Sequence, residues 1–408
     1  MNEPKLRFKA DDGSQFPDWE EKKLGDITEK VVRKNKESNA DVRMISQGNG
    51  FILQSDKYSR ENAGQSLKKY TLLKRDEFAY NHGASKVKPY GVCYRLCESD
   101  EARVPYVYHT FRLIDGNSDF WNYSLNTSYM DRQLKKMVSS GARMDGLLNI
   151  SYDAYMSVNI HAPSIPEQQK IAEFLSTIDT VIEKQKETVS AWEERKKGVM
   201  QKLFSQEVRF KANDGSDFPE WEEKKLGEMF KISTETNGDR YSKQEVLSVS
   251  DEYGVVNQIE LQGRSFAGND ISKYKVVKTG QLIYTRSPLA TKPFGIIKRV
   301  GEKIGIVSPL YIVNDVRENN CSMFWYYNFD TPERTNNYLK PLVRMGAKHT
   351  MNISNEEWLS GRVLSPCLAE QQKIADCLSS LDEVIEKQKA TLAAWEELKK
   401  GLLQQMFI

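Results

Sequence analysis

Two long stretches of the chain carry apolar residues at intervals of seven, the spacing of helices that bury one face. In residues 163–205 these positions form two columns, which are Ile171, Ile178, Gln185, Trp192, Val199 and Leu175, Ile182, Val189, Lys196, Leu203. Residues 366–408 repeat both columns as Ile374, Leu381, Gln388, Trp395, Leu402 and Leu378, Ile385, Leu392, Lys399, Met406. Because Glu and Lys fill the positions between them, each stretch predicts a long helix with a coiled-coil-like seam.

The two helical stretches are copies of one another. The run Glu167-Gln-Gln-Lys-Ile-Ala172 in the first returns as residues 370–375 in the second. About 40 residues at 1.5 Å each predict rods of roughly 60 Å, and the natural partner for the apolar stripe of one rod is the other rod. We predict that the following residues form this seam or face a partner subunit: Ile171, Ile178, Trp192, Ile374, Leu381 and Trp395.

A second repeat precedes each helical stretch by some distance. Residues 7–25 (RFKADDGSQFPDWEEKKLG) return as residues 209–227 with only three substitutions. The Asp-Gly-Ser turn and the Phe-Pro-x-Trp run predict that each of these leading segments docks onto a domain. An alternative interpretation as a nuclease fragment is disfavoured, since the carboxylates of residues 18 and 20 are too close in sequence to frame a metal site.

The blocks between these repeats, residues 26–160 and 228–362, mix short strand-like runs with turns. Residues 71–81 predict strand, turn and strand, residues 82–91 a loop, residues 120–138 one helix, and Asn149-Ile-Ser151 the opening of a last strand. The second block is a divergent copy of the first. The predicted fold class is therefore α/β, with two similar domains joined by two long antiparallel helices in a pseudo-two-fold repeat. The predicted segments are 1–162, 163–205, 206–365 and 366–408.

Composition narrows the class of protein. The chain has 408 residues, of which 39% are hydrophobic and 28% charged, and it contains no run of 18 apolar residues and no apolar leader. These features predict neither a membrane span nor a signal peptide. Five cysteines with no zinc-like spacing predict reduced thiols in a cytoplasmic protein. Neither a metal site nor a catalytic residue is predicted, because the four histidines are scattered and the motifs for ATP, dinucleotides and amino-methylation are missing.

Charge adds a candidate partner. The net charge is only +2, but the positive excess lies in the two blocks between the helices. Binding to phosphates needs such a bias, although this one is modest. Two unequal domains on a rigid pair of rods predict a ruler that grips double-stranded DNA at two half-sites, for which a spacing of about 34–36 Å fits within the rods. Unequal loops predict a bipartite, asymmetric target.

The repeated Glu-Gln-Gln-Lys-Ile-Ala helices, the leading segments with Trp19 and Trp221, and the duplicated variable blocks resemble the specificity subunit (HsdS) of type I restriction-modification systems. The resemblance covers nearly the whole chain. It implies two target-recognition domains that each read half of a split site, with helices that set the gap. It also implies that two methyltransferase subunits, which methylate adenine using S-adenosylmethionine, and translocating restriction subunits are partners, and that this chain binds no cofactor. One departure is that the second helix ends the sequence at Ile408, which leaves open how the circle of repeats closes.

We predict that the DNA-contacting residues follow strands or Gly-rich turns, where loops carry function. In the first domain they are Gln47, Asn49, Asn81, Ser85, Lys86, Lys88 and Arg143. In the second domain they are Ser250, Arg286, Ser287, Lys292, Lys348 and His349. The basic members are expected to touch phosphates more often than bases. The plainer alternative for each residue is a solvated surface loop.

Two other classes of function stay open at this point. The same layout fits a scaffold that carries two peptide-binding domains on a coiled coil. A duplicated enzyme is a more distant alternative, because no catalytic set is present in the sequence.

Overall fold

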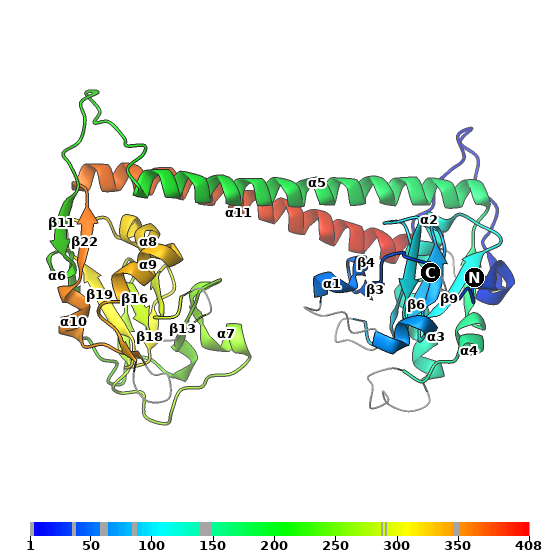
Figure 1. Cartoon of the computed structure of the whole chain (residues 1–408), viewed down its shortest axis with the longest axis horizontal. Helices are drawn as coiled ribbons and strands as arrows, with labels where there is room; N and C mark the ends of the chain where they lie inside the picture. Colours follow the sequence, from blue (N-terminus) through cyan, green and yellow to red (C-terminus); the bar gives the residue numbers. More distant parts are fainter. Residues whose placement is uncertain are drawn as a thin grey trace. The chain divides into compact units, whose positions relative to one another are not determined.

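The computed structural model describes residues 4–34, 38–57, 64–83, 88–138, 148–286, 289, 292–345 and 351–407. The chain divides into two compact units (Figure 1). The first comprises Met1–Glu187 and Ala390–Ile408, and the second comprises Thr188–Lys389. Each unit therefore contains a part of both long helices. The predicted division into four consecutive segments follows the chain rather than these contacts, and it stays a prediction.

The first unit alternates short strands with short helices before the first long helix. Its elements are β1 (Glu20–Lys23), η1 (Leu24–Ile27), β2 (Thr28–Lys30), β3 (Arg43–Ser46), β4 (Gly50–Leu53), α1 (Gln54–Lys57), η2 (Gly64–Lys69), β5 (Thr71–Lys74), β6 (Phe78–Asn81), β7 (Val92–Arg95), β8 (Glu101–Val104), β9 (His109–Leu113), α2 (Ser118–Ser124), α3 (Ser128–Met137), α4 (Tyr152–Met156), β10 (Asn159–Ala162) and the beginning of α5 (Ile165–Phe204).

The second unit repeats this order. Its elements are the end of α5, β11 (Glu222–Lys225), α6 (Leu226–Met229), β12 (Phe230–Ile232), η3 (Lys243–Glu245), β13 (Leu247–Ser250), β14 (Gly254–Asn257), α7 (Gln258–Gln262), β15 (Lys275–Val277), β16 (Leu282–Thr285), β17 (Ile296–Arg299), β18 (Gly305–Val307), β19 (Ile312–Val316), α8 (Ser322–Asp330), α9 (Pro332–Leu339), β20 (Arg344–Met345), β21 (Met351–Asn352), α10 (Asn355–Ser360), β22 (Arg362–Ser365) and the beginning of α11 (Leu368–Met406).

An antiparallel sheet of four strands is the centre of each unit. The strand order is β2-β9-β6-β7 in the first unit and β12-β19-β16-β17 in the second. Smaller pairs surround it in the same pattern in both units, for example β1 with β10 and β11 with β22. The α/β fold class with two long helices is thereby confirmed.

Both faces of the central sheet are buried, which explains why its strands read as continuous apolar runs. In β6, Phe78 and Tyr80 pack into one cluster with η1, α2 and the long helices, while Ala79 packs into a second cluster with β3 and β4. In β16, Leu282 and Tyr284 face the cluster that includes the long helices, and Ile283 faces the other side.

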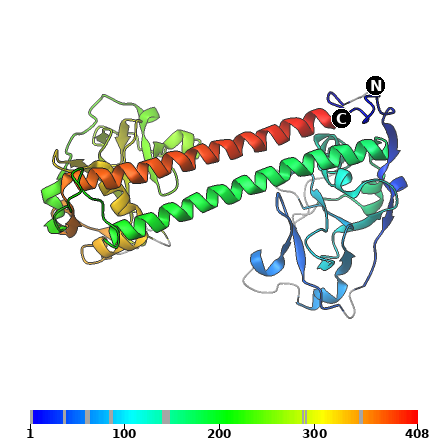
Figure 2. The same cartoon turned by 90° about the horizontal axis from the view of Figure 1, so that it is seen from above.

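Within each unit the long helices lie side by side and run in opposite directions, as Figure 2 shows. In the first unit Ile171 and Ile178 of α5 are buried, and Met406 at the end of α11 shares a cluster with Ile171. In the second unit Ile374 is buried and Leu381 packs against the same cluster. Three of the four positions thus pack into the cores where the long helices meet the domains, Ile178 is buried on α5, and their role in a helix seam stays a prediction.

The two tryptophans predicted as seam anchors lie differently. Trp192 and Trp395 are half-buried and belong to none of the buried clusters. The guanidinium of Arg195 lies 5.2 Å from the Trp192 ring centroid, so this ring packs against a neighbour on its own helix. The deep packing is concentrated where the helices meet a domain, so the two tryptophans do not lie in a buried cluster, and their predicted role at the seam or at a partner interface stays a prediction.

A buried carboxylate joins each leading segment to the start of a long helix. Glu167 is fully buried, and its two oxygens accept from Nε and Nη2 of Arg7 at 3.0 and 2.9 Å. The indole Nε1 of Trp19 donates to the same carboxylate at 3.2 Å. A bidentate guanidinium pair of this kind is among the strong hydrogen-bonded contacts in proteins. Glu370 binds Arg209 and Trp221 in the same way in the second unit.

The next residues of the repeated helix motif fasten the domain. The side-chain oxygen of Gln168 accepts from the backbone N–H of Asn117 at 2.8 Å, and its amide donates to the carbonyl of Pro163 at 2.8 Å. Gln371 makes the equivalent contacts with Cys321 and Pro366. The motif is therefore a docking device, and the leading segments dock as predicted.

Two details of the predicted secondary structure are wrong. The single helix expected over residues 120–138 is two helices, α2 and α3, because the side chain of Asn126 turns back to bind both backbone groups of Cys93. Ser151 opens helix α4 and not a strand, since its hydroxyl caps the backbone N–H of Ala154 at 3.1 Å. In the described residues no helix has the length and apolar character that a membrane span requires.

Arg209→Met is expected to lower the free energy of unfolding of the second unit by about 3–5 kcal/mol, because it leaves the Glu370 carboxylate buried without its counter-charge. Urea denaturation of the full chain, followed by tryptophan fluorescence, measures the change. Arg362→Met is the matched control, since the Arg362–Glu223 pair is more than half exposed and should contribute about 0–1 kcal/mol. Equal losses in the two variants would contradict the assignment.

Candidate nucleic-acid interface

A hairpin at the rim of each unit carries several of the predicted contact residues. Strands β3 and β4 pair so that Ser46 faces Gly50, and strands β13 and β14 pair so that Ser250 faces Gly254. The turn of the first hairpin holds Gln47 and Asn49, of which Asn49 is exposed. Each hairpin leads into a short helix, α1 or α7, on the side of its unit away from α4 or α10 (Figure 1). The turn of the first hairpin therefore presents the polar side chain of Asn49 on the surface of the unit, and we call the turn side of each hairpin its rim.

The strand β6 and the loop behind it supply the second group of predicted residues. Asn81 ends β6, and its side-chain oxygen accepts from the backbone N–H of Gly83 at 3.0 Å. Lys88 lies where the loop returns, and its ammonium donates to the carbonyl of Asn126 at 2.8 Å and lies 3.7 Å from Asp131. The ammonium group of Lys88 is thus held by residues just after α2 and in α3.

Hairpin and loop meet at one junction in the first unit. The hydroxyl of Tyr94 in β7 accepts from the backbone N–H of Gly48 in the hairpin turn at 3.1 Å. In the same strand the backbone N–H of Cys93 donates to the side chain of Asn126, and the carbonyl of Asn126 accepts from Lys88. The turn, the loop and the end of α2 are thus positioned against one another through β7.

The second unit places charged residues at the equivalent junction. Lys292 and Lys298 are buried, and their ammonium groups lie 2.7 and 3.1 Å from a carboxylate oxygen of Asp251 in the hairpin turn. Lys298 also pairs with Asp330 at the end of α8, at 2.7 Å. Burial alone would raise the pKa of Asp251, but the two lysines outweigh burial and hold its pKa below the ordinary value.

The predicted role of Lys292 as a DNA contact is therefore wrong. Its side chain is only 4% exposed and its charge is neutralised within the domain. A buried ammonium keeps its charge only when it is paired in this way. Lys292 supports the hairpin turn from beneath instead of reaching a phosphate.

Arg286 also has a partner within its own unit. It follows β16, is partly exposed, and donates through Nη2 to the carbonyl of Ile353 at 2.8 Å. His82 occupies the equivalent place after β6, where its two ring nitrogens lie 2.8 and 2.9 Å from the carbonyls of Leu148 and Val107. Ser250 lies at the end of β13, where its hydroxyl accepts from the backbone of Tyr253.

The remaining predicted residues lie outside the described part of the chain, and their roles stay predictions. They are Ser85, Lys86, Arg143, Ser287, Lys348 and His349.

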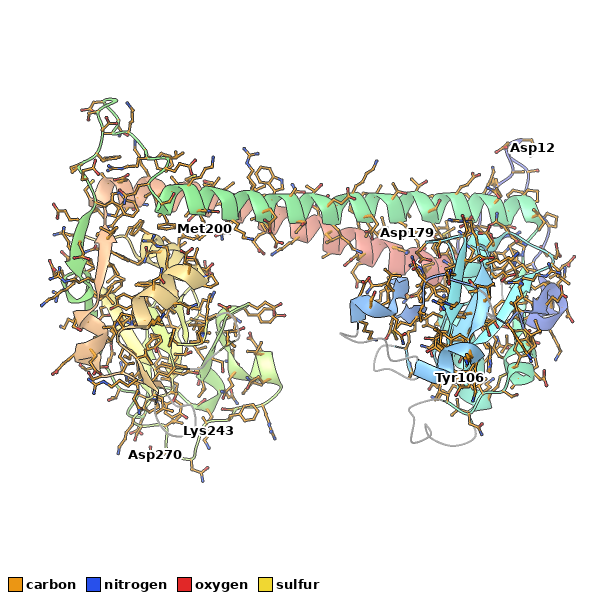
Figure 3. The ribbon with its side chains drawn as sticks, in the orientation of Figure 1. Asp12, Tyr106, Asp179, Met200, Lys243 and Asp270 are labelled. Atoms are coloured by element: carbon orange, nitrogen blue, oxygen red, sulfur yellow. The ribbon has the colours of Figure 1, made fainter. Side chains whose placement is uncertain are left out.

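Sequence reasoning missed several exposed aromatic residues, two of which flank the short helix that follows the second hairpin. Tyr253 and Phe266, on either side of α7, are 58% and 56% exposed, and the guanidinium of Arg264 lies 4.6 Å from the Phe266 ring centroid. In the first unit Tyr106 is 54% exposed, and Figure 3 labels it at the edge of that unit. Exposed aromatic side chains beside basic groups suit apolar contacts with bases. In the sequence, the sign of their exposure is that each of these aromatic residues lies in a polar loop.

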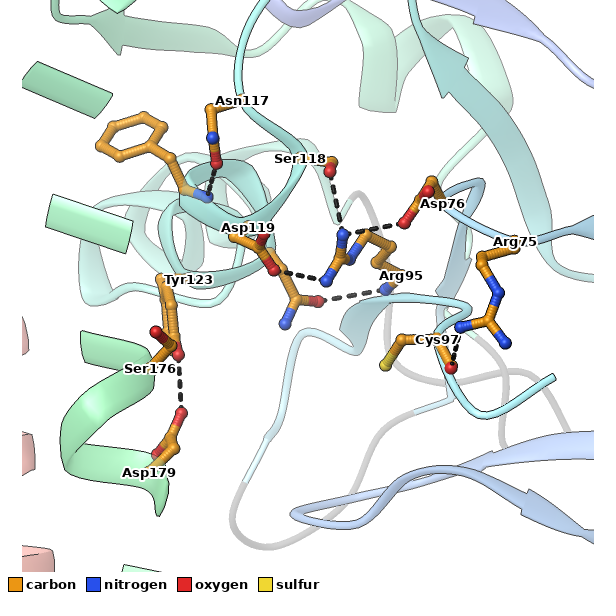
Figure 4. A network of polar contacts seen from close by, with 12 residues as sticks. Arg75, Asp76, Arg95, Cys97, Asn117, Ser118, Asp119, Tyr123, Ser176 and Asp179 are labelled. Carbon is orange, nitrogen blue, oxygen red and sulfur yellow. Dashed lines mark hydrogen bonds and ion pairs between the residues drawn. The ribbon is translucent and has the colours of Figure 1, made fainter. Parts of the chain in front are cut away.

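Hydrogen bonds and ion pairs of Arg95 hold strand β7 against the start of α2. Arg95 donates to Asp76, to Ser118 and to Asp119, as Figure 4 shows. Arg95 follows Tyr94 in β7, so these contacts hold the backbone of the strand that carries Tyr94. The second unit keeps the strand-to-helix contact, with Arg299 donating to Ser322 at 2.9 Å.

Side chains that could ligate a metal ion are scattered among the described residues. Among them, no set of three or more His, Cys, Asp or Glu side chains converges on a point where a metal ion would fit. A cleft of about 860 Å³ in the first unit runs between the domain and the long helices. Its lining has five carboxylates and four ammonium groups, so the cleft lacks the positive excess that favours phosphate. The open rims are therefore the better candidate for contact with DNA.

Comparison with known proteins gives one consistent family. The sequence model described as "Type I restriction modification DNA specificity domain" matches residues 219–394. The chain is 26% identical over 268 residues to the putative type I restriction enzyme MjaX specificity subunit of Methanocaldococcus jannaschii, which covers 60% of this chain and 57% of that protein. It is 23% identical over 305 residues to the type I restriction enzyme MjaVIII specificity subunit of the same organism, which covers 72% of this chain and 69% of the relative.

The fold agrees with this result. The crystal structure of the S subunit of the type I restriction-modification system from M. genitalium covers 100% of this chain and 99% of its own, with a TM-score of 0.56 at 14% identity. The matched residues 219–394 hold the central sheet of the second unit, and the first unit repeats that sheet strand by strand. Residues 219–394 match the model of the type I restriction modification DNA specificity domain, and the chain is similar to the specificity subunits of type I restriction-modification systems.

Proposed function

We propose that this chain is the DNA-recognition subunit of a type I restriction-modification complex. Each unit reads one half of a bipartite, asymmetric site in double-stranded DNA, and the paired long helices set the gap between the halves. The chain itself performs no chemistry and binds no cofactor. Two methyltransferase subunits, which hold S-adenosylmethionine and methylate adenine, and translocating restriction subunits act as its partners.

One observation supports this proposal above the others. The two units share strand order and helix docking, but they differ in the residues of the hairpin turns, with Gln47 and Asn49 in one and Asp251 and Tyr253 in the other. A duplicated frame with unlike rims suits a target with two unlike halves. Base readout uses donors, acceptors and apolar groups of the kinds found at these turns.

The helices suit the role of spacer because they are long and continuous. Helix α5 runs from Ile165 to Phe204 and α11 from Leu368 to Met406, so each has a length of about 60 Å. That length exceeds one turn of DNA, about 34–36 Å, which is the usual distance between half-sites on one face of a duplex.

Mapping of N6-methyladenine in a host strain with and without this chain tests the proposal. We expect one split motif with a fixed gap that is methylated only when the chain is present. Insertion of one heptad into each long helix should lengthen that gap by about three base pairs, since seven residues add about 10 Å and each base pair about 3.4 Å. A methylation pattern that is the same with and without the chain would favour the peptide-binding scaffold instead.

Substitutions of Lys86 and Lys292 distinguish a residue that contacts DNA from one that stabilises the fold. Lys86→Ala should weaken DNA binding about equally for all sequences and reduce the slope of log affinity against log salt by about one. Lys225→Ala, on the exposed strand β11, is the control and should change neither. Lys292→Met should instead lower the midpoint of urea denaturation, because its partner Asp251 loses a buried counter-charge. An unchanged slope for Lys86→Ala in a gel-shift salt series would remove that residue from the interface.

A further inference from the structure

One position in the apolar seam of each long helix is a lysine. The column that contains Leu175, Ile182 and Val189 continues with Lys196, and its copy in α11 contains Lys399. The side chains of these lysines are only 16% and 27% exposed. A polar residue in an apolar seam costs stability, and its best-attested use is to specify the register of the helices.

In the first unit Lys399 completes a three-residue joint. Its ammonium pairs with Asp179 of α5 and lies 5.5 Å from the ring centroid of Tyr123 in α2. The hydroxyl of Tyr123 donates to the other oxygen of Asp179 at 2.7 Å, a contact drawn in Figure 4. The joint therefore connects both long helices to the domain.

The second unit contains the same joint with the two helices exchanged. Lys196 of α5 pairs with Asp382 of α11 at 2.6 Å and lies 5.1 Å from the ring centroid of Tyr327 in α8. The Tyr327 hydroxyl donates to Asp382 at 2.7 Å. Each lysine thus reaches an aspartate on the opposite helix, and each aspartate also holds the adjacent domain.

Both tyrosines keep their protons in these joints. Burial, followed by the adjacent aspartate, raises the pKa of Tyr123 above its ordinary value. For Tyr327, burial and the Asp382 carboxylate raise the pKa and outweigh the opposing contact with Ser379. Each hydroxyl is therefore a permanent donor at neutral pH.

The sequence around the joints penalises the alternative registers. A shift of one heptad in one direction would place Lys399 opposite Lys186 and Lys196 opposite Lys389, which brings like charges together. The shift in the other direction would place the same lysines opposite Ala172 and Ala375, which are buried and offer no counter-charge.

The aspartates add to this penalty. In the two shifted registers Asp179 would face Met406 or Leu392, and Asp382 would face Leu203 or Val189. Either shift would therefore strand a carboxylate against the apolar column as well as a lysine away from its partner. The observed register is the one that pairs all four charges.

We propose that the two Tyr–Asp–Lys joints fix the register of the helix pair and the seat of each domain on it, and thereby determine the single gap length that the protein accepts. This inference rests on the proposed function. The six residues are positioning residues, since they lie in the helices and behind the domains rather than at the rims that read bases.

The test uses the full chain with both seam lysines replaced, Lys196→Leu together with Lys399→Leu. Leucine completes the apolar column, so the variant should remain folded. Affinity is measured for duplexes that carry the cognate halves at the normal gap and at gaps changed by one to three base pairs. We expect the preference of the wild type for the normal gap to fall by about tenfold, equal to about 1.4 kcal/mol, while the affinity for isolated half-sites stays the same.

Two further variants make the result specific. Exchange of the pair, Asp179→Lys with Lys399→Asp, should keep the gap preference in the first joint, whereas Asp179→Lys alone should weaken it. Lys400→Leu is the control, since the Lys400–Glu397 pair is exposed and lies on a single helix. Tyr123→Phe with Tyr327→Phe removes only the two hydroxyls and should also relax the preference.

The outcomes separate this inference from the proposed function. An unchanged gap preference in both the leucine and the phenylalanine variants would overturn the role of the joints. A wild-type chain that prefers no split site at all, in the presence of its methyltransferase subunits, would overturn the proposed function itself.

Discussion

The carboxylate of Glu167, fully buried at the start of α5, is the contact on which the assembly of the first unit depends. It binds Arg7 and Trp19 of the leading segment, and the next residue, Gln168, fastens the backbone before α2. A buried charge without a counter-charge is too costly to persist, so the leading segment cannot leave without destabilising the helix start. Because Glu370 repeats these contacts with Arg209 and Trp221, one interaction specifies the architecture twice.

The junction between a long helix and a leading segment is built in the same way in both units. In the second unit the chain passes directly from α5 into the leading segment, and the N–H of Val208 donates to the carbonyl of Lys202. In the first unit the N–H of Leu6 donates to the carbonyl of Gln405 near the end of α11, although the two residues belong to opposite ends of the sequence. Phe407 packs on Phe120 as Phe204 packs on Phe324. Packing and hydrogen bonds therefore replace the covalent link, and the first unit depends on both ends of the chain.

Structural features that repeat at a fixed spacing could be predicted from the sequence. Features that depend on a contact with a residue far away in the sequence could not. Heptad columns and duplicated motifs predicted the long helices, the two α/β domains and the buried positions Ile171 and Ile374. The end of helix α2 was missed because the competing partner of Asn126 is the backbone of Cys93, in another strand. The burial of Lys292 could not be predicted, because its neutralising carboxylates, Asp251 and Asp330, are about 40 residues away in either direction. Ser354 followed three residues later by Glu357 is a sequence signature of a helix start. Because Ser151 is the counterpart of Ser354 in the first domain, this signature also predicts a helix start at Ser151.

Whether a residue differs between the two halves depends on where its contacting side chain lies. At the junction beneath the hairpins, Gln47, Tyr94 and Asn126 of one unit correspond to Asp251, Lys298 and Asp330 of the other. These partners lie within a single domain, so changes of charge can compensate one another locally, and the buried lysines are matched by partly buried aspartates. The partners of Glu167 and Asp179 lie in the leading segment and on α11, where a lone change would disturb a contact shared with the rest of the unit. The contacts that fasten each domain to the leading segment and to the long helices are therefore constrained to stay the same in both halves. The contacts beneath each hairpin turn are free to differ, as the proposed target with two unlike halves would require.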